Sequence, residues 1–88
     1  LREYKKAVGC YEKAIQIIPN YANTYYNLGI VFKELGEYQK TIDCYEKAIL
    51  IDPNYVNAYN NLGVILGELD HVHEAKKKFE RGATPFSH

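Results

Sequence analysis

The chain is built from one unit that recurs every 34 residues. A shift of 34 places Tyr11–Ile15 on the identical stretch Tyr45–Ile49, and Asn27–Gly29 on Asn61–Gly63. A period of this length is typical of arrays in which each unit packs only against its neighbours. The sequence therefore predicts a solenoid rather than a globule with a single core.

Within the central unit, the apolar residues form two successive runs with helical spacing. From Tyr25 to Leu35 they recur at spacings of three and four, and Gly36 follows where a left-handed residue would end a helix. A second run begins at Tyr38 and ends before Pro53, which cannot continue a helix. The connection is too short for anything but an antiparallel pair of helices.

Applying this register to residues 1–88 predicts one array of repeats, which has three parts. Residues 1–21 form a half repeat with one helix at about Tyr4–Ile17, and residues 22–55 form a full repeat. Residues 56–88 form a second full repeat with an irregular end, whose helix pair runs from Val56 to about Ala83. Asp70 stands at the turn position of that pair, where the central repeat has Gly36.

Small and aromatic residues are predicted to pack the helix pairs. Gly29 and Gly63 would let paired helices approach closely, with Thr41 and Ala75 as the small residues opposite them. Six tyrosines are predicted to fill space between helices, with their hydroxyls reaching the surface: Tyr4, Tyr11, Tyr25, Tyr38, Tyr45 and Tyr59.

The charge balance excludes several classes of partner. The chain has 11 basic and 11 acidic residues, so no net field attracts nucleic acid or an anionic membrane. No apolar run approaches the roughly 20 residues that span a bilayer, and no signal peptide is visible. We expect a cytoplasmic protein. Cys10 and Cys44 occupy equivalent repeat positions, too far apart in a stack for a disulfide, and are predicted to be free thiols.

No set of residues indicates catalysis, a metal or a cofactor. The sequence lacks a serine-histidine-acid set, a phosphate-binding glycine loop and a Cys-x-x-Cys motif. His71 and His73 could ligate a metal only with a further ligand, and neither cysteine lies in the same repeat, so no third ligand is evident. No aromatic or glycine-rich loop accompanies the basic residues around Lys77, which favours a solvated face over a nucleic-acid site. We therefore predict that the chain is not an enzyme and binds no cofactor.

The central unit resembles the tetratricopeptide repeat, a family of 34-residue helix-turn-helix units. The matching residues are Tyr25, Leu28, Gly29, Phe32, Gly36, Tyr38, Tyr45, Ala48 and Pro53. The resemblance implies an all-α, right-handed superhelical solenoid. It also implies a protein-interaction module, in which the first helix of each repeat lines a concave groove that binds a protein or peptide.

Placing that groove on this sequence gives Asn23, Tyr26, Asn27, Ile30, Lys33, Asn57, Asn60, Asn61 and Val64. Asn27 and Asn61, one per repeat, would form a short ladder whose amides pair with the backbone of an extended peptide. The ladder resembles those of O-linked N-acetylglucosamine transferase-type repeat domains. The alternative is that these asparagines stabilise the helix pair or face water.

Two further functions stay open. The first helix has no partner helix before it, which would leave Val8, Tyr11 and Ile15 uncovered and able to mediate homo-oligomerisation or stacking as a spacer in a longer array. Alternatively, the chain is a non-catalytic, substrate-recruiting arm of a glycosyltransferase-type enzyme, which would use the same groove.

Overall fold

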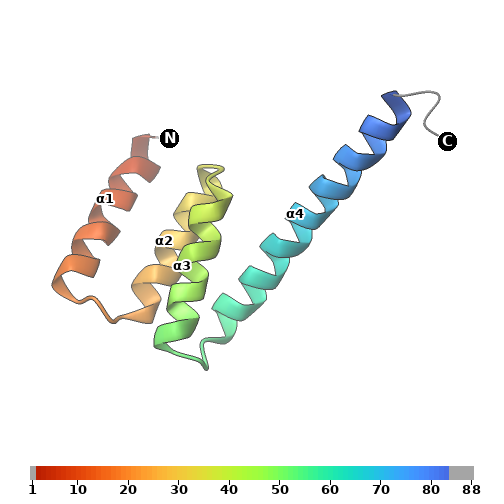
Figure 1. The fold of residues 1–88 in the computed structure, drawn as a ribbon. Helices are drawn as coiled ribbons and strands as arrows, with labels where there is room; N and C mark the ends of the chain where they lie inside the picture. Colours follow the sequence, from red (N-terminus) through yellow and green to blue (C-terminus); the bar gives the residue numbers. More distant parts are fainter. Residues whose placement is uncertain (1, 84–88) are drawn as a thin grey trace.

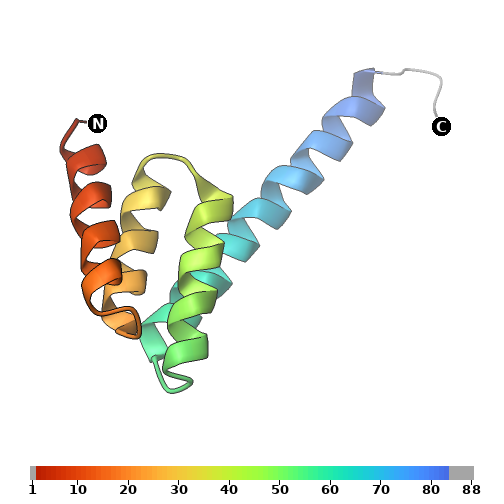
Figure 2. The same ribbon diagram turned by 60° about the vertical axis from the view of Figure 1, so that its left-hand side comes forward.

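The fold consists of four helices in chain order (Figure 1). The computed structural model describes the backbone of residues 2–83 and the side chains of residues 2–72. The helices are α1 (Arg2–Ile17), α2 (Ala22–Glu34), α3 (Tyr38–Ile51) and α4 (Val56–Ala83). The predicted all-α architecture is confirmed, and α1 to α3 lie side by side (Figure 2).

The α2–α3 hairpin forms as predicted and turns at Gly36. Gly36 has a φ of 78°, and it is the one positive value among the described residues. The Glu37 amide donates to the Phe32 carbonyl at 2.9 Å and the Gly36 amide to the Lys33 carbonyl at 2.9 Å. These two bonds form a Schellman motif, which satisfies carbonyls at the end of α2 and reverses the chain.

The hairpin is closed by an aromatic ring that occupies the space of a missing side chain. A Cβ atom added at Gly29 would lie 2.6 Å from Cε1 of Tyr45 and 3.2 Å from Cβ of Cys44. Tyr45 is only 1% exposed. The predicted close approach at Gly29 is therefore confirmed, because only glycine leaves room for this ring.

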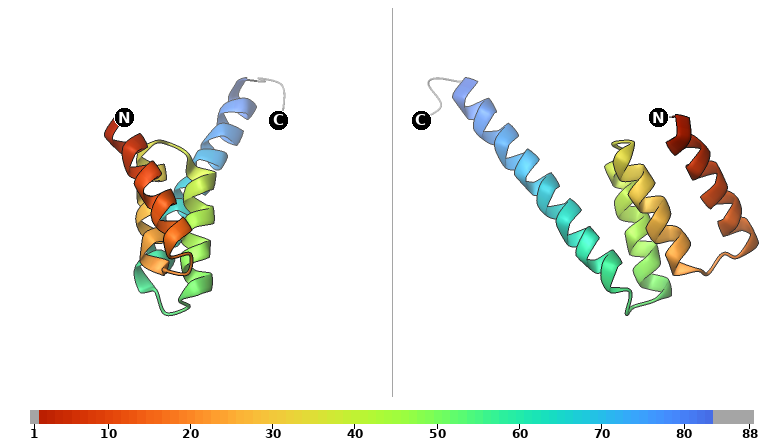
Figure 3. Two further views of the ribbon diagram at one scale, coloured as in Figure 1. Left: turned by 90° about the vertical axis from the view of Figure 1, so that its left-hand side faces the viewer. Right: turned by 180° about the vertical axis from the view of Figure 1, so that it is seen from behind.

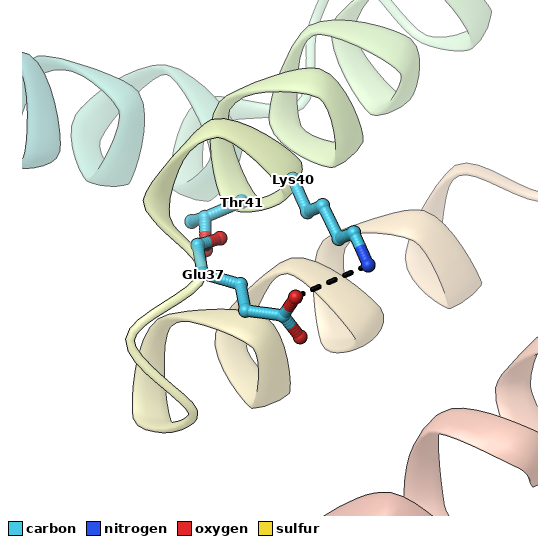
Figure 4. A network of polar contacts seen from close by, with 3 residues as sticks. All are labelled: Glu37, Lys40 and Thr41. Atoms are coloured by element: carbon cyan, nitrogen blue, oxygen red, sulfur yellow. Dashed lines mark hydrogen bonds and ion pairs between the residues drawn. The ribbon is translucent and has the colours of Figure 1, made fainter.

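The three atoms nearest to a Cβ built at Gly29 belong to Tyr45 and Cys44, whereas Thr41 was the small residue predicted opposite Gly29. The Thr41 side chain is fully buried, and its hydroxyl donates to the Glu37 carbonyl at 3.1 Å. Lys40 forms an ion pair with Glu37 at 3.1 Å on the same turn (Figure 4). Thr41 thus bonds within the start of α3, which satisfies its buried hydroxyl, while Cys44 and Tyr45 face Gly29.

Helix α1 packs against α2 through the residues predicted to be uncovered. Val8, Tyr11 and Ile15 are half-buried and contact a cluster of Leu28, Phe32 and Cys44. The expectation that these three lack a covering helix is wrong. The apolar face of α1 is partly covered by α2, the first helix of the next repeat.

Helix α4 corrects the predicted second helix pair. It continues through Asp70 to Ala83 as one 28-residue helix, and its second half extends past the other helices (Figure 3). The predicted turn at Asp70 is absent because a left-handed residue with a side chain costs about 1–2 kcal/mol, whereas a continued helix satisfies the backbone. The radius of gyration is 16.7 Å, against about 12 Å for a compact domain of this length.

Because α4 does not fold back, several packing predictions for it are wrong. No described atom lies within 4 Å of a Cβ built at Gly63, so the expected pairing of Gly63 with Ala75 is absent. Tyr59 is 49% exposed. Tyr4 and Tyr38 are also exposed, so three of the six tyrosines predicted to fill space between helices are not buried there.

The first half of α4 is held by two small clusters. Ala58 is fully buried against Ala22 and Ala48, and Ile65 is buried against Ile42 and Tyr45. The first cluster joins the start of α4 to α2 and α3, and the second joins its middle to α3. Within the described part of the chain, no helix is long and apolar enough to cross a bilayer.

The glycine contact gives a stability prediction with an internal control. We expect Gly29→Ala to destabilise the protein by about 1–3 kcal/mol, because the added methyl overlaps the buried Tyr45 ring. Gly9 lies in the interior of α1 with nothing within 4 Å. Gly9→Ala should therefore stabilise by about 0.5–1 kcal/mol. Urea unfolding followed by circular dichroism measures both, and equal effects would contradict the packing argument.

Candidate protein-interaction groove

Four of the predicted groove residues lie on one face of α2, and three of them contact residues between Tyr55 and Glu68. Asn23, Tyr26, Ile30 and Lys33 follow the three-and-four spacing of a helix face. We call their line of contacts with the α3–α4 loop and α4 the α2–α4 seam. The seam joins successive repeats along the side where the groove was predicted.

Polar contacts mark the two ends of the seam. At one end the Tyr55 hydroxyl donates to Oδ1 of Asn23 at 2.6 Å. At the other, Nζ of Lys33 lies 3.9 Å from Oε1 of Glu68. Both side chains of that ion pair are substantially exposed, so it contributes little stability. Between the two ends, Ile30 packs against the cluster that contains Ile65.

Tyr26 occupies the centre of the seam. Its ring lies 5.8 Å from the Tyr45 ring and 5.2 Å from the Tyr55 ring, measured between centroids. Its hydroxyl accepts a hydrogen bond from Nδ2 of Asn61 at 3.1 Å. Tyr26 is therefore a half-buried joint between α2, α3 and α4, a role that sequence reasoning did not assign to it.

The remaining predicted groove residues differ in exposure. Asn27 and Asn61 are half-buried, whereas Asn57, Asn60 and Val64 are exposed. Within the described residues, neither the Asn27 side chain nor the Asn61 side-chain carbonyl makes a hydrogen bond. These amide groups can still pair with a ligand, so the structure leaves a row of asparagines beside the seam.

Tyr55 and Glu68 belong to the seam but were missed by the sequence analysis. The shift of 34 relates equivalent positions, whereas Tyr55 and Asn23 are 32 residues apart. The repeat pattern therefore contains no signal for this contact. A hollow of about 440 Å³ lies next to it, lined by residues that include Asn20, Asn23 and Tyr55.

Burial sets the protonation of two tyrosines around the seam. It raises the pKa of Tyr45, an effect that the Asn61 side chain partly offsets. It also raises the pKa of Tyr55, with smaller contributions from Tyr26, Tyr21 and Asp52. An ordinary tyrosine is already protonated at neutral pH, so the Tyr55 hydroxyl can donate to Asn23. No group of three potential metal ligands occurs in the part of the chain that the structure describes.

The two cysteines are chemically different although they occupy equivalent positions. Both are free, as predicted; Cys10 is exposed and Cys44 is buried. Burial, with smaller contributions from Asp43 and Glu12, raises the pKa of Cys44 to about 11. The Cys44 thiol is therefore neutral and poorly nucleophilic near neutral pH.

The central hydrogen bond of the seam can be tested with a double-mutant cycle. We expect Tyr26→Phe and Asn61→Ala to show a coupling energy of about 0.5–1.5 kcal/mol in urea unfolding, because each removes one partner of the same bond. Tyr25→Phe combined with Asn61→Ala is the matched control, since the Tyr25 hydroxyl makes no hydrogen bond among the described residues. A coupling energy no larger than that control would contradict the contact.

The difference between the cysteines predicts selective labelling. At pH 8 the native protein should react with one equivalent of a thiol reagent, at Cys10. In the Cys10→Ser variant, labelling of Cys44 should be slow, because its pKa is raised and its side chain is buried. Mass spectrometry after timed labelling measures both rates. Rapid labelling of Cys44 in the folded variant would contradict its burial.

Family models of known repeats match three overlapping segments. A tetratricopeptide repeat model matches residues 22–55, a TPR repeat model residues 3–36, and another tetratricopeptide repeat model residues 44–77. No characterised protein sequence gives a significant match. The match to residues 22–55 coincides with the α2–α3 repeat and the loop that follows it.

Solved structures with the same architecture include two crystal structures of MamA. One is 34% identical with a TM-score of 0.76, and the alignment covers 93% of this chain and 48% of MamA. The other is 35% identical with a TM-score of 0.74, covering 90% and 43%. The chain thus spans about half the length of these structures. With three overlapping repeat models that together match residues 3–77 and this fold, the chain belongs to the tetratricopeptide repeat family, whose repeats are generally protein-interaction modules.

Proposed function

We propose that this chain binds an extended segment of a partner protein along the face shared by α2 and the first half of α4. The observation that supports this most is the row of asparagines beside the α2–α4 seam, made of Asn27, Asn57, Asn60 and Asn61. Each amide offers two donors and one acceptor. Side chains of this kind pair with the backbone of a peptide whatever its sequence.

The seam gives this row its rigidity. The bond between Asn61 and Tyr26 holds α4 against α2, and the bond between Tyr55 and Asn23 holds the α3–α4 loop there, so the amides of Asn27 and Asn61 are held at one spacing before a ligand arrives. Preorganisation reduces the entropy lost on binding. A peptide in extended conformation would lie across both helices, as in the O-linked N-acetylglucosamine transferase-type ladders that the sequence resembles.

Asn61 has two roles in this proposal, and Asn27 has one. The amide nitrogen of Asn61 donates to the Tyr26 hydroxyl and also interacts with the Tyr45 hydroxyl, which leaves its carbonyl for a ligand. Loss of Asn61 therefore weakens both the seam and the ligand contact. Loss of Asn27 weakens binding alone, so the two positions can be separated by experiment.

Apolar contact is available next to the amides. Val64 is 53% exposed and lies on the same face of α4 as Asn57 and Asn61. A ligand side chain that covers Val64 would add hydrophobic stabilisation. With so short a groove, an affinity on the order of micromolar is expected.

A role as a spacer in a longer repeat array is the second candidate. It is favoured by the elongated shape, 58 by 32 by 15 Å, and by the coverage of only about half of each MamA chain. In a longer array the same face would continue onto neighbouring repeats. A substrate-recruiting arm of a glycosyltransferase-type enzyme would use this face in the same way.

Peptides selected from a random phage-displayed library on the wild-type chain test the groove. We expect Asn27→Ala/Asn61→Ala to weaken their binding by about tenfold or more, because each lost hydrogen bond is worth about 1 kcal/mol. N-methylation of the peptide backbone should weaken binding similarly, whereas alanine substitution of most peptide side chains should not. Isothermal titration calorimetry measures all three effects.

The control variant uses the other pair of equivalent asparagines. Asn20 and Asn54 are also 34 residues apart, and both are exposed in the loops between repeats. Asn20→Ala/Asn54→Ala should bind the selected peptides like the wild type. If both double variants bind equally well, or if N-methylation has no effect, the amide ladder is not the binding site.

A further inference from the structure

The hollow beside the seam combines two aromatic rings with a single negative charge. Its volume is about 440 Å³, and it lies between the α1–α2 loop and the α3–α4 loop, which are at the same end of the molecule (Figure 1). The first loop contributes Tyr21, and the second contributes Asp52 and Tyr55. Among the described residues that line the hollow, Asp52 is the only one that is ionised near neutral pH.

Tyr55 and Asp52 have free acceptors but no free donors at the edge of the hollow. The Tyr55 hydroxyl uses its hydrogen in the 2.6 Å bond to Asn23, which leaves only oxygen lone pairs for a ligand. One carboxylate oxygen of Asp52 accepts the Asn54 amide at 3.0 Å, and the second makes no hydrogen bond to a described residue. These two side chains therefore suit a ligand that donates hydrogen bonds and accepts none.

The two rings of the hollow are held differently. The Tyr55 ring is half-buried and lies 5.2 Å from the Tyr26 ring, so packing and the bond to Asn23 fix it in place. Tyr21 is 54% exposed. After burial and Tyr26, both Tyr21 and Asp52 raise the pKa of Tyr55, as nearby groups of negative charge do. Because the face of a tyrosine ring attracts cations, two rings beside a carboxylate favour a positively charged ligand.

The helix ends beside the hollow do not reverse this preference. Helix α3 ends there with the negative end of its dipole, and α2 begins there with the positive end. These partial charges, each about half an elementary charge, oppose each other, whereas Asp52 carries a full charge. A shift of 34 places Ile18 at the position of Asp52, so this charge belongs to the second loop and is not part of the repeat.

We propose that the hollow binds a cationic group of the alkylammonium or guanidinium class, supplied by a lysine or arginine side chain of a partner protein. Such groups donate hydrogen bonds and accept none. The charged end would lie against Asp52 and the Tyr55 hydroxyl, and the aliphatic stem against the Tyr21 ring.

The hollow adjoins the groove through α2. Asn23 lines the hollow, and Asn27 follows one helical turn later, about 6 Å along the helix. The four-carbon stem of lysine reaches over a comparable distance. A segment paired with Asn27 could therefore place a cationic side chain in the hollow. That the cation belongs to this segment rests on the function proposed above, whereas binding of the cation itself does not.

The Nα-acetyl, N-methylamide derivative of lysine tests the hollow without a peptide. Titrated into the isotope-labelled chain, it should shift the backbone amide signals of Tyr21, Asp52 and Tyr55 in nuclear magnetic resonance spectra. We expect a dissociation constant on the order of 10 mM, because single contacts at exposed sites are weak. The same derivatives of norleucine, which lacks the charge, and of glutamate, which reverses it, are the controls.

Two results of this titration would overturn the proposal. One is the absence of saturable shifts in these signals up to about 50 mM of the lysine derivative. The other is an equal response to the norleucine or the glutamate derivative.

Two pairs of variants separate the charge from the ring. Asp52→Asn removes the charge and should raise the dissociation constant about threefold or more. Asp43→Asn should leave it unchanged, because this exposed residue lies roughly 13 Å away along α3, beyond the screening length. Tyr21→Leu should raise it about twofold or more, whereas Tyr21→Phe keeps the ring and should not. Equal effects within either pair would contradict the proposed contacts.

Peptides selected on the wild-type chain test whether the cation and the asparagines share one ligand. We expect a lysine or arginine at one fixed position of these peptides. Its replacement by norleucine should weaken binding to the wild type about threefold and leave binding to Asp52→Asn unchanged. Peptides without a fixed cationic residue would contradict the link to the groove.

The two proposals can fail separately. If Asn27→Ala/Asn61→Ala binds the peptides like the wild type while the lysine derivative still saturates the hollow, the groove is wrong and the cation site stands. If the peptides need both asparagines but the lysine derivative does not bind, the cation site is wrong and the groove stands.

Discussion

The packing of Tyr45 against Gly29 is the contact on which the other helix positions depend. The ring fills the space of the missing glycine side chain and so sets the distance between α2 and α3. Its other edges meet Tyr26 and the cluster of Ile42 and Ile65. One buried ring therefore joins the two helices of a repeat and also forms part of the surface on which α4 docks. The distance between α2 and α4, along which the seam and the row of asparagines lie, therefore depends on the position of this ring.

The sequence was most informative about the helices and turns within one repeat. The helices of the central unit and the stop at Gly36 followed from apolar spacing and a glycine, because both are local properties of the chain. It was misleading where a position depends on its partner. Gly63 has the same neighbours in sequence as Gly29, yet no ring covers it, since Asp70 does not make the turn that would bring one back.

The same distinction explains what could be predicted of the candidate groove. Spacing alone placed Asn23, Tyr26, Ile30 and Lys33 on one face of α2. It could not reveal that Tyr26 accepts a bond from Asn61, because that contact joins positions that are not equivalent in the repeat. Likewise, Val8 was expected to be bare because its own repeat lacks a first helix, but the following repeat covers it. The 34-residue period therefore did not predict which residues of successive repeats contact one another.

The way each helix is attached implies an uneven distribution of stability along the chain. Helices α2 and α3 are covered on both sides, whereas α1 is held through one face and α4 through its first half. In such linear arrays the ends open without disturbing the middle. Backbone amides of α2 and α3 should therefore exchange their hydrogens most slowly, and exchange should become faster toward both ends. Unfolding of a single chain would then proceed inward from α1 and α4 rather than in one cooperative step.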